Sequence, residues 1–251
     1  MNKLFAFSLF SFLMLSMYFN LSAQRVEFAL ESGLSFQSYN DIRIPGDGGE
    51  QFSFTEDFSR SYSPYFRLTA KVNIAKRHAI LLTAAPYEIK ESGSLNRDLF
   101  FEDQLFQAND PLSVAWKFNS WRISYEYKLV QREKLDFNIG FTAKLRDARI
   151  AVSNDSIFTE NTDLGFVPII RFVLDWKFHE NAGFLVDGDA LIGPQGRAED
   201  VLFALYYTFN ENFRMFGGYR VLEGGADIDE VYNFSLTNYI AIGLRLDLGN
   251  N

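Results

Sequence analysis

The chain of 251 residues contains no cysteine, so disulfide bonds contribute nothing to its stability. Beyond residue 23 it also lacks any long apolar run, which excludes a protein that spans a membrane with helices. Lysine and arginine number 24 against 32 aspartates and glutamates, and the net charge is -8. Binding of nucleic acid through a general basic field is therefore excluded. The chain has only two histidines, His78 and His179, for acid–base chemistry or metal binding.

The one long apolar run lies at the N-terminus and is typical of a secretory signal peptide. Lys3 supplies the positive start, residues 4–21 are rich in Phe, Leu and Met, and Leu21-Ser22-Ala23 is a suitable cleavage site. A membrane-spanning helix that stays uncleaved is the alternative, but polar residues interrupt its end and no basic stop-transfer cluster follows. We expect residues 1–23 to be a signal peptide and residues 24–251 to form a single exported domain.

Aromatic residues are abundant, at 17% of the chain with 27 Phe and 12 Tyr. Apolar and polar residues alternate with period two in many segments. The clearest is residues 135–146, where odd positions are apolar and even positions are polar or glycine. A transmembrane barrel strand turns every second side chain toward lipid, and aromatics form belts at both interfaces. The pattern predicts an all-β fold, a closed antiparallel transmembrane β-barrel of the bacterial outer membrane.

Ten segments of this kind can be traced, an even number that places both termini at the same end of the barrel. They span residues 25–38, 64–74, 78–89, 113–130, 135–146, 165–178, 183–193, 200–209, 212–222 and 231–248. The alternation changes phase near Asn119-Ser120, which we interpret as a β-bulge. Barrels of eight or twelve strands are the alternatives.

The connections between these segments alternate between short and long, as periplasmic turns and outer loops do in such barrels. Short turns are expected near 75–77, 131–134, 179–182 and 210–211, and longer loops near 39–63, 90–112, 151–164, 194–199 and 223–230. Aromatic residues collect beside the short turns, as in an interfacial belt. A water-soluble barrel such as a lipocalin is the alternative, but it would leave the charged face to solvent.

If the polar faces line the interior, charges of both signs are interspersed there at every depth. In the narrow lumen that ten strands enclose, such groups are expected to pair across the space. The predicted luminal charge network consists of Arg67, Arg122, Glu126, Asp136, Lys144, Arg146, Arg171, Asp175, Asp187, Asp189, Arg220 and Arg245. Two interpretations stay open: a salt-bridged plug that rigidifies the barrel, which we favour, and a charge-lined conduit for a small solute.

The sequence contains little that points to catalysis. Outer-membrane hydrolases of this size generally use a histidine as general base at the outer end, whereas both histidines here lie at short, periplasmic turns. The acidic loop with Asp227, Asp229 and Glu230 offers carboxylates to Ca²⁺ or Mg²⁺, but a full site needs about six oxygens and no further ligands are evident. We predict no catalytic, cofactor-binding or metal-binding residue.

Several stretches resemble a known family. They are residues 218–234 from Gly218-Tyr219-Arg220 onward, residues 141–148, Asp187-Gly188-Asp189-Ala190, and Gly193-Pro194-Gln195-Gly196-Arg197. They are similar to a family of small, porin-like outer-membrane β-barrel proteins of Gram-negative bacteria, roughly from Tyr65 to the C-terminus. The resemblance implies the barrel fold and the cell outer membrane. The family has no assigned activity, so no functional residue is carried over.

Two functions of different classes therefore remain. The first is a non-enzymatic outer-membrane barrel, either structural or narrow and porin-like, with a charged lumen. The second is an outer-membrane enzyme that acts on lipid or peptide at the cell surface. The expected partners are outer-membrane lipids and lipopolysaccharide, and the barrel-assembly machinery during biogenesis. No cofactor is expected, and the sequence leaves the oligomeric state and any transported solute open.

Overall fold

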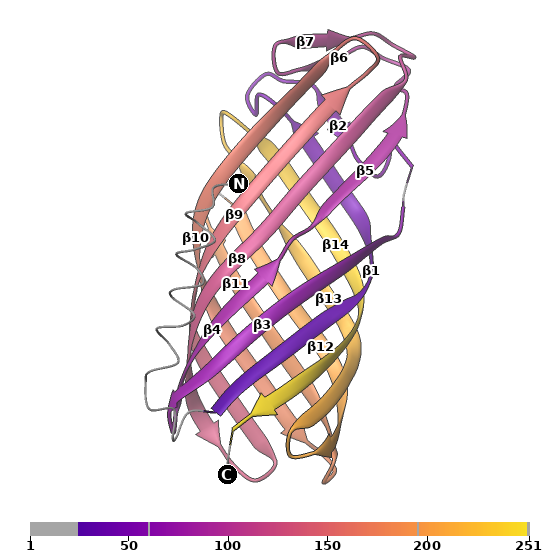
Figure 1. The fold of residues 1–251 in the computed structure, drawn as a ribbon. Coiled ribbons are helices and arrows are strands. Elements are labelled where there is room, and N and C mark those ends of the chain that lie inside the picture. The colour runs from indigo at the N-terminus through magenta and orange to yellow at the C-terminus, as the bar shows by residue number, and fades with distance from the viewer. Residues whose placement is uncertain (1–24, 60, 195, 250–251) are drawn as a thin grey trace, which may run out of the picture.

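The computed structural model describes residues 25–59, 61–194 and 196–249, so the expected signal peptide at residues 1–23 lies outside the described residues. The elements it describes are strands (Figure 1). They are β1 (Arg25–Arg43), β2 (Gln51–Ser53), β3 (Ser63–Ala75), β4 (His78–Ala85), β5 (Glu88–Gly93), β6 (Leu99–Phe101), β7 (Gln104–Phe106), β8 (Leu112–Gln131), β9 (Leu135–Ser153), β10 (Phe158–Lys177), β11 (Ala182–Gly193), β12 (Gly196–Asn210), β13 (Phe213–Asp227) and β14 (Tyr232–Leu248). No helix in this part of the chain is long and apolar enough to cross a bilayer.

The long strands pair antiparallel with their neighbours in sequence, and β14 pairs with β1 to close the ring. β4 and β5 are two parts of one barrel strand. Both pair with β8, and the register is kept across the break, since Ala85 pairs with Ser120 and Glu88 with Lys117. The fold is a closed antiparallel β-barrel of ten strands, which confirms the prediction. Closure provides partners for the backbone groups of every barrel strand, as lipid requires.

The alternation in the sequence sets the two faces of the wall. On β9, the side chain of Phe141 points outward with 69% of its surface exposed, whereas that of Thr142 points inward with 1% exposed. Outward aromatics pack on one another beside the short turns: the ring centroids of Trp176 and Phe178 are 5.7 Å apart, and those of Tyr207 and Phe209 are 5.0 Å apart. This apolar wall with an aromatic belt is the surface that lipid covers.

Several strands run further toward the outer end than the alternation predicts. β9 and β10 continue until only residues 154–157 connect them, and the expected loop at 223–230 shrinks to residues 228–231. Gly193 pairs with Gly196, so the loop expected at 194–199 is a tight turn. Above the lipid, both faces of a strand meet water or loops, so the ladder of backbone hydrogen bonds continues where the period-two signal fades.

The expected bulge at Asn119-Ser120 is wrong. β8 pairs with β9 in one register from Ser113 to Lys128, and the shift lies between Lys128 and Val130. Even-numbered residues of β8 face the interior along its length, first Leu112, Val114 and Trp116, then Ser120, Arg122, Ser124 and Glu126. The phase change in the sequence therefore reports a change in the interior, from apolar near the outer end to polar near the periplasmic end.

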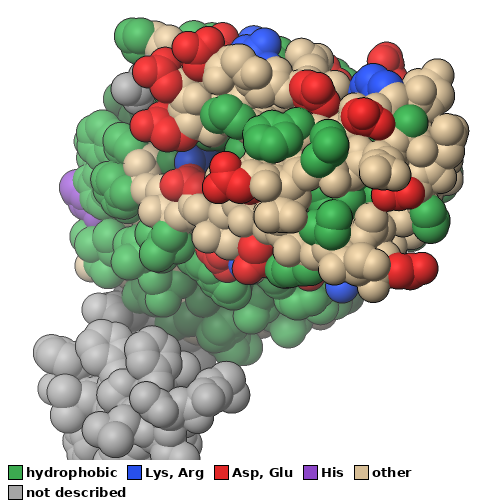
Figure 2. All heavy atoms as spheres, turned by 90° about the horizontal axis from the view of Figure 1, so that it is seen from above, with side chains coloured by type: hydrophobic (Ala, Val, Ile, Leu, Met, Phe, Trp, Pro, Cys, Tyr) green, Lys and Arg blue, Asp and Glu red, His purple; other side chains and the backbone are tan. Residues whose placement is uncertain are grey.

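Two long connections close the outer end of the barrel. The segment 44–62, which includes β2, and the segment 94–111, which includes the β6–β7 hairpin, bury Phe52, Leu99, Phe101 and Phe106 almost completely. The ring of Phe52 meets that of Phe101 edge-on at 6.0 Å. We call these two segments the outer cap. Figure 2 shows this end from above, with acidic side chains distributed over it and far fewer basic ones.

Candidate functional site in the barrel interior

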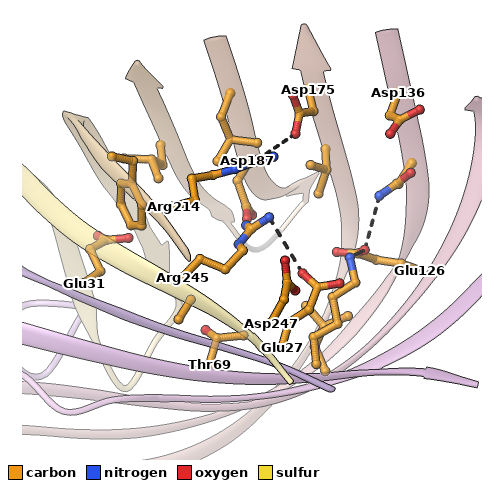
Figure 3. Close-up of a pocket in the computed structure, with 18 of the residues that line it drawn as sticks. Glu27, Glu31, Thr69, Glu126, Asp136, Asp175, Asp187, Arg214, Arg245 and Asp247 are labelled. Atoms are coloured by element: carbon orange, nitrogen blue, oxygen red, sulfur yellow. Dashed lines mark hydrogen bonds and ion pairs between the residues drawn. The ribbon is translucent and has the colours of Figure 1, made fainter. Parts of the chain in front are cut away.

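A cavity of about 390 Å³ occupies the interior on the side of the short turns. Residues at the ends of strands line it, among them Arg25, Lys177, Asn210 and Asp247, so it opens at the periplasmic end. All ten barrel strands contribute side chains to its wall, and charged groups of both signs point into it (Figure 3). We call it the periplasmic cavity.

Ion pairs cross the periplasmic cavity between strands that are far apart in sequence. Glu126 on β8 accepts hydrogen bonds from Lys71 on β3 at 2.7 Å and from Arg171 on β10 at 2.6 Å. Arg214 on β13 reaches Asp175 on β10 at 3.0 Å. Each pair joins strands that are not neighbours in the wall, so the pairs tie together strands that the backbone hydrogen bonds do not connect.

Asp200 is the centre of a second, deeper layer of charge. Its carboxylate pairs with three arginines from three strands: Arg67 at 2.6 Å, Arg220 at 2.6 Å, and Arg122. Arg220 also donates two hydrogen bonds to Glu31, at 2.7 and 2.8 Å, and Arg122 donates one to Asp189 at 2.6 Å. These six side chains, which we call the Asp200 layer, are buried or nearly so, and their charges offset one another away from water.

An aromatic layer lies above the Asp200 layer. The rings of Tyr65 and Tyr239 are 4.5 Å apart, Tyr239 and Tyr87 are 5.7 Å apart, and Trp116 stacks on Phe118 at 5.3 Å. Tyr87 comes from the break between β4 and β5, where its ring also meets Trp116 edge-on. The aromatic layer separates the periplasmic cavity from the outer cap.

Most of the predicted luminal residues meet in the cavity and the Asp200 layer, in ion pairs within 4 Å. These are Arg67, Arg122, Glu126, Arg171, Asp175, Asp187, Asp189, Arg220 and Arg245. Asp136 lines the cavity but forms no ion pair with a described residue.

Lys144 and Arg146 lie apart from the network. Lys144 is buried directly opposite Arg122 on the neighbouring strand, and its ammonium lies 4.6 Å from the ring of Phe118, without an ion pair to a described residue. Arg146 pairs with Asp163 higher on the β9–β10 hairpin, where both side chains are partly exposed. Lys144 and Arg146 lie on the same face of β9, and the height of each along the strand decides which partners it reaches.

Asp200 itself is absent from the predicted network. On β12, the inward residues after Asp200 are Leu202, Ala204 and Tyr206. They are as apolar as the outward residues, so the two faces of this strand look alike in the sequence. The tight turn after Gly193 is the signal that could have located it. That turn fixes the register and places Asp200 opposite Asp189.

The residues considered for other chemistry are not assembled into a site. His78 lies at the short-turn end with its Nδ1 2.7 Å from the hydroxyl of Tyr125, and His179 belongs to a short turn. Asp227 in the acidic loop lies 3.9 Å from Arg43. Among the described residues, no three potential ligands are close enough together to hold a metal ion.

Neither the protein-family models nor the curated proteins contain a match to the chain. Among solved structures, the outer membrane protease OmpT of Escherichia coli matches with a TM-score of 0.50 at 9% identity, over 89% of this chain and 97% of that one. The translocator domain of the autotransporter NalP from Neisseria meningitidis gives 0.42 at 10%, over 96% and 94%. The attachment invasion locus protein Ail of Yersinia pestis gives 0.35 at 9%, over 88% and 99%.

At these identities the likeness to OmpT concerns the fold alone. The fold and its apolar outer wall define the chain as an outer-membrane β-barrel protein of the Gram-negative type. A closed barrel with an apolar wall and an aromatic belt is suited to the cell outer membrane, the location that the sequence predicts.

Proposed function

We propose that the protein is a non-enzymatic, structural outer-membrane barrel whose lumen is closed to solutes. The observation that carries this proposal is the pair of layers above the periplasmic cavity. The Asp200 layer crosses the lumen with buried ion pairs, and the aromatic layer follows it directly.

Passage of a solute would require these layers to part. Separating Asp200 from Arg67, Arg122 and Arg220 would leave charges without partners in a low-dielectric interior, which costs about 3–5 kcal/mol for one broken buried pair. The outer cap adds a further barrier of packed phenylalanines. We therefore favour a rigid barrel over a narrow conduit, although the periplasmic cavity gives the conduit an entrance from one side.

An outer-membrane enzyme is the weaker candidate. Both histidines lie at the short-turn end, away from the surface where lipid or peptide substrates would arrive. The partners we propose are the lipids around the apolar wall, including lipopolysaccharide in the outer leaflet, and the assembly machinery during biogenesis.

Single-channel recording in a planar bilayer tests the proposal. The unmodified protein should give no stable current. The double variant Tyr87→Ala/Tyr239→Ala removes two rings of the aromatic layer and should raise the frequency of channel openings. It also serves as the positive control, because its openings show that barrels inserted in the bilayer can be detected. Large, stable currents from the unmodified protein would contradict a closed lumen.

A further inference from the structure

The periplasmic cavity has the size of a ligand site. At about 390 Å³ it falls within the range of roughly 300–1,000 Å³ that small-molecule pockets occupy. It is open to the periplasm and ends at the Asp200 layer, so a molecule could enter and leave without crossing the barrel. Its binding capacity is thus separate from conduction and from the proposed structural function.

Two opposite charges in this cavity each make only one ion pair within 4 Å. Arg245 on β14 has a single ion pair, with Glu27 at 3.8 Å, and its guanidinium donates no hydrogen bond to a described residue. Asp187 on β11 pairs with Arg171 at 3.0 Å through one oxygen and is partly exposed to the cavity. Figure 3 shows Arg245 and Asp187 extending toward the same part of the cavity. Their charges attract each other, and Asp175 and Asp247 also act on the charge of Arg245, but no ion pair within 4 Å joins Arg245 to Asp187. A guanidinium has five N–H donors, so Arg245 retains most of its capacity.

Apolar side chains stand beside Asp187. Val173 and Leu202 are the direct neighbours of Asp187 on the two adjoining strands. Leu185 and Phe216 also line the cavity. A ligand that reaches both Arg245 and Asp187 would therefore rest its uncharged part on hydrocarbon.

We propose that the periplasmic cavity binds a small zwitterion with an apolar side chain, an amino acid or short peptide. Its carboxylate would bind the Arg245 guanidinium, which can hold both oxygens, and its ammonium would bind Asp187. The side chain would contact Leu185, Leu202 and Phe216. A simple anion could pair only with Arg245 and a simple cation only with Asp187, because each carries one sign of charge.

Isothermal titration calorimetry on the protein in lipid nanodiscs at low salt tests this site. The probes are leucine and leucyl-leucine, with N-acetyl-leucinamide as the neutral analogue, and 4-methylpentanoate and isoamylamine as the singly charged ones. Both zwitterions should bind at least tenfold more tightly than any of the three analogues. This comparison uses the unmodified protein and needs no variant to fold.

Variants then assign the contacts. Arg245→Gln and Asp187→Asn should each weaken binding of the zwitterions at least tenfold, and Lys90→Gln, on the outer face of β5, should leave it unchanged. Heat-dependent electrophoretic mobility checks that each variant is folded. Absence of binding to the unmodified protein, or equal binding of N-acetyl-leucinamide, would overturn the proposal. Neither result bears on conductance, so the closed lumen is tested independently.

Discussion

The periplasmic half and the outer half of the barrel interior share the same strands but are filled by different chemistry. On β8, the inward face carries Ser120, Arg122 and Glu126 in the periplasmic half, and Val114 and Trp116 in the outer half. Arg122 and Glu126 pair with charges from other strands, whereas Val114 and Trp116 belong to the apolar cluster that continues into the outer cap.

The difference shows that a polar interior is not a fixed property along the whole barrel. In the periplasmic half, charged side chains line the cavity or are buried in ion pairs, and the narrow lumen brings opposite signs together. Where the connections fold over the end, water is excluded and apolar residues take the inward positions. The two halves therefore stabilise one barrel by directional ion pairs and by close packing, and they should respond differently to substitution.

The largest effect is expected for Asp200→Asn in the charged half. An amide in place of the carboxylate leaves Arg67, Arg122 and Arg220 without their shared counter-charge in a buried site. We expect the free energy of unfolding to fall by about 3–5 kcal/mol. Guanidinium titration of the protein in lipid vesicles measures it.

Asp163→Asn is the matched control for this prediction. It breaks the ion pair with Arg146, whose members are 48% and 29% exposed, so water replaces the lost partner. The expected change is within about 1 kcal/mol. Equal losses in the two variants would mean that burial does not distinguish the Asp200 layer from a surface pair.

Asp200 also marks how far the sequence determines the site. Alternation located the ten strands and the inward face because lipid imposes it on every strand of the wall. Arg122, Glu126 and Arg171 stand out in the sequence because polar residues on those strands contrast with apolar ones on the other face, and the structure buries all three. On β12 the contrast is missing, and Asp200 could be found only from the register set by the turn after Gly193.

The outer half was less predictable for a related reason. In the outer half of β8, the inward residues are the apolar Leu112, Val114 and Trp116, whereas lower on the strand the apolar residues face lipid. The cap that covers them comes from residues 44–62 and 94–111, and alternation within β8 carries no information about it. Contacts between segments so far apart in sequence leave no periodic signal. The strand ends, the absence of a bulge at Asn119-Ser120 and the aromatic layer therefore emerge only from the structure.

The next largest effect is expected for Phe52→Ala in the outer cap. Phe52 is buried against Phe58 and Phe101, and loss of the ring leaves a cavity among them. We expect a loss of about 3–4 kcal/mol, together with faster proteolysis of residues 44–62. Phe100→Ala, on the exposed side of β6, should change stability by less than about 0.5 kcal/mol. Equal effects at the two positions would show that the cap is not packed.

Two phenylalanines at different heights on the outer wall test where lipid covers the barrel. Phe141→Arg places a charge in the hydrocarbon and should cost about 2–4 kcal/mol. Phe158→Arg changes the same residue type at nearly the same exposure, 64% against 69%, but next to the turn at 154–157. It should be almost neutral in the same vesicle titration. Similar losses would place both residues at one depth and contradict the assignment of the wall.

A smaller effect, of opposite sign, is expected where the two halves meet. Lys144 is buried opposite Arg122 without an ion pair to a described residue, and like charges directly opposite each other are destabilising. Lys144→Met keeps the length and the contact with Phe118, and it should stabilise the barrel by about 1 kcal/mol. Lys71→Met removes an ion-pair partner of Glu126 and should destabilise the barrel. Destabilisation by both changes would show that the Lys144 ammonium contributes as an ion-pair partner.

The smallest effect is expected when acid protonates Asp57 in the outer cap. Arg97 donates two hydrogen bonds to Asp57, at 3.1 and 2.9 Å, and the amide of Ser53 donates a third at 2.8 Å. Burial alone would raise the pKa of Asp57, but these bonds outweigh it and hold the pKa below the ordinary 3.8. The stabilisation is therefore present above pH 3.8 and is lost as pH falls through the lowered pKa, and partial exposure keeps it under about 1 kcal/mol. Proteolysis of residues 44–62 by an acid-active protease should speed up at pH 3 relative to pH 5, and less so in Asp57→Asn. Identical pH profiles for the two proteins would show that this carboxylate does not clamp the cap.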